Sequence, residues 1–199
     1  MIRTILHYPD KRLRQKGQRI EEITPEIKAL ADDMAETMYA APGVGLAATQ
    51  IGETLQLFVV DVAAEDEPSD LRVFINPEIL ETEDAITWTE GCLSFPGVQE
   101  EVERAAHVKV RAQDRDGKSF TLEAEGLLAV AIQHEYDHLQ GVLMIDHLGP
   151  LKRRVVQRKM QKRAEANASS KPDRHSAEST HCGAGSMSVG ERKATARQE

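Results

Sequence analysis

The heptapeptide Gln133-His134-Glu135-Tyr136-Asp137-His138-Leu139 places the pattern H-E-x-x-H within a predicted helix. Residues four apart lie on one face of a helix, so both imidazoles can reach a single metal ion. Glu135 is rotated from His134 by about 100° around the helix axis. It can therefore act on water beside the metal without binding the metal itself. The segment predicts a hydrolytic metal site.

The residues around this pattern predict a buried helix from Glu125 to about Gln140. Its apolar side chains cover most of the helix surface: Leu127, Leu128, Val130, Ala131, Ile132 and Leu139. Two imidazoles and a carboxylate inside such a helix would be costly to bury without partners. A metal ion would supply them, which makes a chance match on a solvated helix the weaker interpretation.

A catalytic site of this type needs a third protein ligand and one open position. Downstream of the motif the chain offers Asp146 and His147, but no G-x-x-H continuation. Upstream, Cys92 lies in Glu90-Gly91-Cys92-Leu93-Ser94. A lone cysteine is more often a small buried apolar residue than a ligand. The residues alone therefore leave the third ligand open.

Three segments taken together resemble the peptide deformylase family. They are GVGLAATQ at 43–50, EGCLS at 90–94 and QHEYDHL at 133–139. They match the family motifs G-x-G-L-A-A-x-Q, E-G-C-L-S and Q-H-E-x-D-H-L in order and without a departure. The resemblance covers about residues 1–164 and is closest to the bacterial type with a C-terminal helix.

The resemblance implies an α+β domain over residues 1–166. We expect the H-E-x-x-H helix at its centre, antiparallel or mixed β-sheets around it, an N-terminal helix and a C-terminal basic helix. The implied reaction is metal-dependent hydrolysis of the N-formyl group from the N-terminal methionine of newly made polypeptides, with release of formate.

The resemblance also assigns the metal ligands, which are Cys92, His134 and His138. The metal is Fe2+ in most family members and can be replaced by Zn2+, Ni2+ or Co2+. A thiolate with two imidazoles suits several of these ions, so the residues themselves do not choose among them.

Catalytic roles follow from the same resemblance. Glu135 is expected to accept a proton from water and pass it to the leaving amine. The side-chain amide of Gln50 and the backbone N–H of Leu93 are expected to stabilise the oxyanion. Glu90 and Asp137 are candidates to accept the second N–H of a ligand histidine.

The substrate is expected to lie extended along a strand edge, because Gly43 and Gly45 allow close backbone approach. Alignment with the family places four further residues near the methionine side chain: Val44, Trp88, Leu127 and Ala131. The simpler interpretation of each of these four is an ordinary core residue.

Local patterns predict the remaining elements. Thr24-Pro25 is a helix start, with apolar residues at helical spacing as far as Met38. Residues 43–52 are predicted to form a glycine-punctuated loop. Strands are expected at 55–62, 73–76, 78–81, 85–88, 98–103, 107–113 and 119–124.

The chain has 199 residues, 40% of them hydrophobic, and a net charge of −8, which fits one globular domain rather than a general nucleic-acid binder. One segment differs sharply from this acidic background. Residues 152–163 contain no acidic residue and seven basic ones: Lys152, Arg153, Arg154, Arg158, Lys159, Lys162 and Arg163.

A basic helix is expected over about 151–166. Its apolar residues are Leu151, Val155, Val156 and Met160. Packing of that stripe on the body would suffice to explain it. The resemblance adds a possible partner, because related bacterial enzymes use such a helix to dock on the ribosome.

Residues 167–199 lack an apolar period and are expected to form a disordered tail. We find no signal peptide and no apolar run of the roughly 18–20 residues that span a bilayer. A cytoplasmic location without a membrane partner is expected. Two alternative functions remain, an H-E-x-x-H zinc protease and a non-catalytic ribosome-associated protein.

Overall fold

The computed structural model describes residues 1–64 and 66–169. Its helices are α1 (Pro25–Ala40), α2 (Gly126–Leu139) and α3 (Pro150–Ser169), with short 3-10 turns η1 (Lys11–Arg14), η2 (Ala48–Ile51) and η3 (Met144–His147). Its strands are β1 (Gly45–Ala47), β2 (Leu57–Val60), β3 (Arg72–Glu83), β4 (Ile86–Gly91), β5 (Gln99–Arg104), β6 (His107–Gln113) and β7 (Ser119–Glu125).

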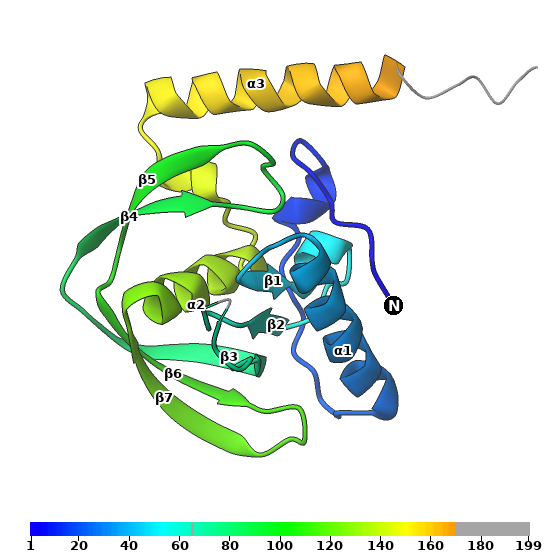
Figure 1. The fold of residues 1–199 in the computed structure, drawn as a ribbon, viewed down its shortest axis with the longest axis vertical. Coiled ribbons are helices and arrows are strands. Elements are labelled where there is room, and N and C mark those ends of the chain that lie inside the picture. Colours follow the sequence, from blue (N-terminus) through cyan, green and yellow to red (C-terminus); the bar gives the residue numbers. More distant parts are fainter. Residues whose placement is uncertain (65, 170–199) are drawn as a thin grey trace, which may run out of the picture.

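The strands form two antiparallel sheets. Five of them are hydrogen-bonded in the order β1-β2-β3-β6-β7, and β4 pairs separately with β5. Figure 1 shows α2 between the five-stranded sheet and the β4–β5 hairpin. The expected α+β class with a central helix is confirmed.

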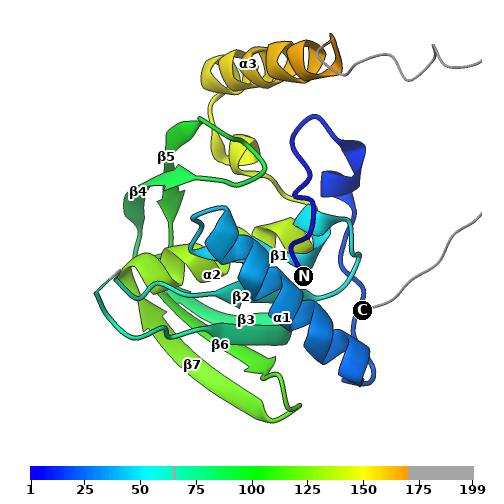
Figure 2. The ribbon, with the colours of Figure 1, turned by 45° about the vertical axis from the view of Figure 1, so that its right-hand side comes forward.

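The side chains of β2 point alternately to the two faces of the large sheet, which explains why helices cover both faces. Phe58 and Val60 pack into the core shared with α2, whereas Leu57 and Val59 pack into the core shared with α1. Successive side chains of a strand point to opposite faces. The continuous apolar run of β2 is therefore buried on both sides, and Figure 2 shows α1 crossing the face opposite α2.

The two predicted helix starts are close to those observed. α1 begins at Pro25, and the Thr24 side chain accepts a hydrogen bond from the Ile27 N–H at 3.4 Å, as expected for an N-cap. α2 is flanked by Glu125 and Gln140, the two residues that bounded the prediction.

The structure corrects three predicted segments, two strands and one loop. β3 is one strand over Arg72–Glu83 rather than separate strands at 73–76 and 78–81. Its pairing with β6 shifts register between Ile75 and Glu78, where Asn76 has a φ of 50°, so a bulge absorbs the irregularity and the strand continues. The expected loop at 43–52 contains β1 and η2, because pairing with β2 makes a strand of three residues.

α3 continues through Ser169, three residues beyond the expected boundary at 166. The rest of the predicted tail, residues 170–199, lies outside the described residues.

Two of the four apolar residues expected to pack on the body, Val156 and Met160, are buried there. The other two, Leu151 and Val155, are 78% and 60% exposed. Within the described residues, no helix combines the length and the apolar character needed to cross a membrane.

Candidate metal centre and active site

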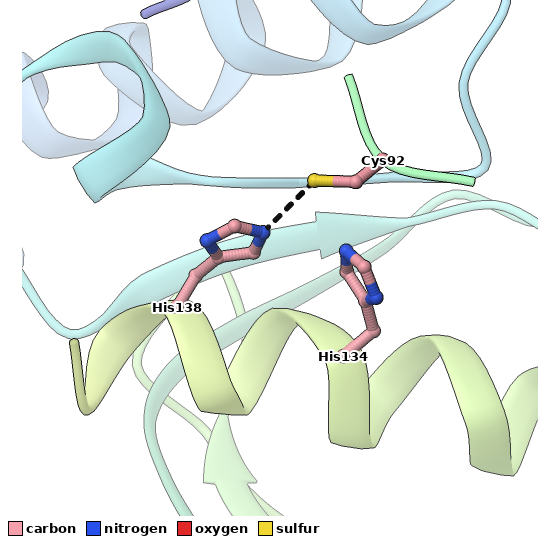
Figure 3. Close-up of side chains that lie close together, drawn as sticks. All are labelled: Cys92, His134 and His138. Carbon is pink, nitrogen blue, oxygen red and sulfur yellow. Dashed lines mark hydrogen bonds between the residues drawn. The ribbon is translucent and has the colours of Figure 1, made fainter. Parts of the chain in front are cut away.

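Three potential metal ligands meet between α2 and the β4–β5 hairpin. α2 carries His134 and His138, and Cys92 follows the last residue of β4. Figure 3 shows the cysteine sulfur above the two rings. The sulfur and one ring nitrogen from each histidine all lie within 4.8 Å of one another.

The hydrogen bonds of the histidines determine which atoms face the centre of this cluster. His134 Nδ1 lies 2.8 Å from Glu90 Oε2, which leaves His134 Nε2 for the cluster. His138 Nε2 lies 3.3 Å from Cys92 Sγ. Burial lowers the pKa of His138 well below its ordinary value, which favours the neutral form of the ring that metal binding requires.

The residues present fit a divalent metal ion. Bonds of about 2.0–2.3 Å in tetrahedral geometry hold nitrogen and sulfur donors roughly 3.5 Å apart. The 3.3 Å between His138 Nε2 and Cys92 Sγ is close to that spacing. In the described part of the chain, Glu135 Oε2 is buried without a hydrogen-bond partner. This is expected if a molecule bound at the metal supplies the missing hydrogen bond.

Glu135 lies beside the cluster in a setting suited to proton transfer. Its side chain belongs to the buried residues of α2, and burial raises its pKa to about 7. A carboxyl group with a pKa near neutral can both accept and donate a proton at physiological pH.

Gly45 gives Glu135 the space that it occupies. A Cβ atom at position 45 would lie 2.5 Å from Glu135 Oε1 and 2.9 Å from Cδ and Cγ.

We expect Gly45→Ala to lower kcat by about 100-fold, because even a 1 Å displacement of a reacting group can cost that much. Kinetics of Gly45→Ala with a formyl-methionyl peptide, the substrate that the resemblance implies, test this. Gly149→Ala is the control, since nothing lies within 4 Å of the added Cβ atom there; equal kcat for the two variants would contradict the prediction.

Gln50 is held with its amide nitrogen toward the cluster. Its Oε1 accepts the Ala47 N–H at 2.9 Å, so its Nε2 is the atom that faces Ser94 Oγ at 3.1 Å and Cys92 Sγ at 3.7 Å. Sequence reasoning did not single out Ser94, which is fully buried and anchors this amide.

A cavity of about 790 Å³ opens over these residues. Every predicted catalytic and substrate-binding residue lines it: Gly43, Val44, Gly45, Gln50, Trp88, Leu93, Leu127, Ala131 and Glu135. Cys92 and His134 line it as well. The structure thus brings these residues together around one space, and their individual roles remain predictions.

Sequence reasoning missed Arg104, the last residue of β5. Its side chain is 4% exposed and makes ion pairs with Glu90 at 2.7 Å and Asp137 at 2.5 Å. Burial alone would raise the pKa of Glu90, but hydrogen bonds from His134 and Arg104 outweigh it and bring the pKa to about 2. The only sequence signal was an arginine at an inward-facing position of an alternating strand.

The other candidate ligands do not reach the cluster. Asp146 pairs with Arg14 and accepts the Leu143 N–H, while His147 hydrogen-bonds Asp137. Asp137 itself contacts Arg104 and His147, so it does not orient a ligand histidine directly. Of the two candidates for that role, Glu90 makes the contact.

Comparison with known proteins assigns the chain to a family. The model of the family described as polypeptide deformylase matches residues 2–154. The chain belongs to the peptide deformylase family. Peptide deformylase from Mesorhizobium japonicum is 52% identical over 171 residues, which cover 85% of this chain and 97% of that protein. The Agrobacterium fabrum peptide deformylase is 53% identical over 166 residues, covering 83% and 98%.

Solved peptide deformylases share the fold. A crystal structure from Legionella pneumophila superposes with a TM-score of 0.79 at 45% identity and covers 86% of this chain and all of its own. A structure from Ehrlichia chaffeensis in complex with actinonin gives 0.78 at 35% identity, covering 81% and 97%. Peptide deformylases are metal-dependent hydrolases that remove the N-formyl group from nascent polypeptides, and this chain is one of them. The protease and the non-catalytic alternatives are not favoured.

Proposed function

We propose that Cys92, His134 and His138 bind one divalent metal ion at which this deformylase hydrolyses the formyl group, within a catalytic domain formed by residues 1–166. The convergence of one sulfur and two ring nitrogens within 4.8 Å, beside Glu135, is the observation that supports it. We propose Fe2+ as the native ion, with Zn2+, Ni2+ or Co2+ as substitutes that the same donors accept.

The bound ion would activate water and polarise the formyl oxygen. Glu135 is suited to take the proton of the attacking water, because its Oε2 is buried without a hydrogen-bond partner among the described residues and its side chain lines the same cavity as Cys92 and His134. The same carboxyl group then returns the proton to the departing amine, so that formate and a free amino terminus result. A group with a pKa near 7 serves both steps.

Gln50 and Leu93 stabilise the charge that develops on the formyl oxygen. Gln50 Nε2 is 3.7 Å from Cys92 Sγ and is prevented from turning by its two other hydrogen bonds. Leu93 follows Cys92 directly and lines the same cavity, so its backbone is available as the second donor. Fixed neutral donors of this kind contribute a few kcal/mol each.

The substrate backbone adds to the free edge of β1. β1 is the terminal strand of the five-stranded sheet, and Gly43, Val44 and Gly45 line the cavity along it. An extended peptide can pair with such an edge through main-chain hydrogen bonds. The methionine side chain would then reach the apolar part of the cavity near Trp88 and Leu127.

The test is formate release from a formyl-methionyl tripeptide under anaerobic conditions, with metal analysis of the same sample. The proposal predicts one metal ion per chain and formate production that stops when a chelator removes the ion. An acetyl-capped peptide and an unformylated peptide are the controls. Cleavage of internal peptide bonds would indicate a protease, and absence of formate release with the metal bound would contradict the proposal.

We further propose that α3 docks on ribosomal RNA in the cytoplasm, where new chains emerge. Three exposed basic residues lie at successive turns of α3, namely Arg154, Arg158 and Lys162, and their side chains make no hydrogen bond or ion pair with other described residues. In contrast, Arg153 donates to the carbonyl oxygens of Ile145 and Asp146. The unpaired stripe supports the proposal, because it offers regularly spaced positive charges to phosphates.

Substitution tests docking better than deletion, because Val156 and Met160 of the same helix are buried. We expect the triple variant R154Q/R158Q/K162Q to lose ribosome co-sedimentation and the salt dependence of binding, with formate release unchanged. The control variant is K118Q/R115Q, which removes basic residues from the distant β6–β7 turn. Unchanged co-sedimentation of the triple variant across a salt series would contradict docking through α3.

A further inference from the structure

A chain of hydrogen bonds leads from the protein surface to His134. His147, whose side chain is 30% exposed, lies 2.7 Å from Asp137 Oδ2 through its Nε2. Arg104 Nη1 donates to the same Asp137 oxygen at 2.5 Å. The Nε and Nη2 atoms of Arg104 donate to Glu90 at 2.7 and 3.0 Å, and Glu90 Oε2 contacts His134 Nδ1 at 2.8 Å.

The protonation of His147 at Nε2 follows from its neighbours. Asp137 offers only acceptor oxygens, so the 2.7 Å contact requires a proton on the ring nitrogen. With Nε2 protonated, Arg104 Nη1 at 3.4 Å from the same nitrogen is a second donor, and the two donors make no hydrogen bond with each other. His147 therefore donates to Asp137 whether its ring is neutral or charged.

His147 is itself firmly held. It is the last residue of η3, where Asp146 Oδ2 accepts the Leu143 N–H at 2.8 Å. Arg153 of α3 donates to the Ile145 and Asp146 carbonyl oxygens at 2.9 and 2.8 Å. The His147 ring that donates to Asp137 therefore lies on a turn that several hydrogen bonds hold in place.

Asp137 depends on this donor for its position. Among the described residues, its carboxylate has only Arg104 and His147 as hydrogen-bond partners, and its side chain is 22% exposed. Without His147, the carboxylate can rotate toward solvent. Arg104 then loses its second anchor, and the guanidinium that fixes Glu90 against His134 becomes less constrained.

We propose that His147 is a positioning residue for the metal centre, acting through Asp137, Arg104 and Glu90 on the orientation of His134. This inference rests on the proposed function, because it requires His134 to be a metal ligand. His147 does not line the cavity, so it acts without touching the substrate.

The test compares His147→Phe, which removes the donor, with His147→Gln, whose amide N–H can replace Nε2. Zn2+ affinity is measured by competition with a chromophoric chelator. We expect about 10-fold weaker Zn2+ binding for His147→Phe, at the lower end of the effect of outer partners of metal ligands. His147→Gln should retain the affinity, and kcat should fall in His147→Phe with KM unchanged.

The matched control is His107→Phe, because His107 is a half-exposed histidine that faces Glu125 at 3.7 Å on the large sheet. His147→Ala is measured in parallel, so that a folding failure of the phenylalanine variant leaves the test intact. If the variants without the donor bind Zn2+ as wild type does, or if His147→Gln loses as much affinity as they do, the inference is wrong. Absence of Zn2+ binding by the wild type would overturn the proposed function as well.

Discussion

Replacing Glu135 by glutamine is expected to lower kcat for formyl-methionyl peptide by about 10²- to 10⁴-fold, the usual contribution of a general acid–base group. The amide preserves the shape of the side chain but cannot take a proton from water. Since Glu135 is not among the three clustered ligands, the variant should still bind one metal ion. Steady-state kinetics combined with metal analysis measure both properties on one sample.

The control for this variant is Glu125→Gln, which changes a carboxylate that is 81% exposed at the start of the same helix. It should leave kcat unchanged. If Glu135→Gln retains normal turnover, Glu135 is not the proton carrier. If Glu135→Gln loses its metal, the residue has a ligand role that the geometry does not assign to it.

Arg104→Met is expected to have the largest effect on stability. Arg104 and Glu90 have side chains that are 4% and 3% exposed, so removing the arginine leaves a buried carboxylate without its main partner. Breaking a buried ion pair in this way costs about 3–5 kcal/mol in the free energy of unfolding. Urea denaturation of the metal-free protein measures it.

Arg111→Met is the matched comparison, because Arg111 pairs with Glu78 on the surface and both side chains are more than half exposed. Such pairs contribute at most about 1 kcal/mol. The double variant R104M/E90Q should recover part of the loss, since it removes both charges. Equal costs for Arg104→Met and Arg111→Met would show that the buried pair does not stabilise the fold.

Local sequence signals were sufficient where a few neighbouring residues determine the structure. Thr24-Pro25 predicted the start of α1 because a threonine cap and a proline at the first position act within one turn. The apolar run before His134 predicted a buried helix for a similar reason. β1 was missed because a three-residue strand forms only when β2 is beside it.

The candidate site depended on contacts that no local pattern contains. Cys92 reaches His138 across 46 positions of the chain, and only the family resemblance selected it from the other candidates. Arg104 was not predicted, and His147 was considered only as a third metal ligand, because the contacts of both residues are with carboxylates that β4 and α2 bring to them. Spacing within the H-E-x-x-H helix predicted two candidate ligands, whereas the choice of the third came from the resemblance alone.

The most direct measurement is X-ray absorption spectroscopy at the zinc edge of the Zn2+-loaded protein. The central claim predicts one sulfur neighbour at about 2.3 Å and imidazole nitrogens at about 2.0–2.1 Å. The sulfur signal should persist in Cys182→Ser and disappear in Cys92→Ser. A zinc spectrum without sulfur, or one that Cys92→Ser leaves unchanged, would contradict coordination by Cys92, His134 and His138.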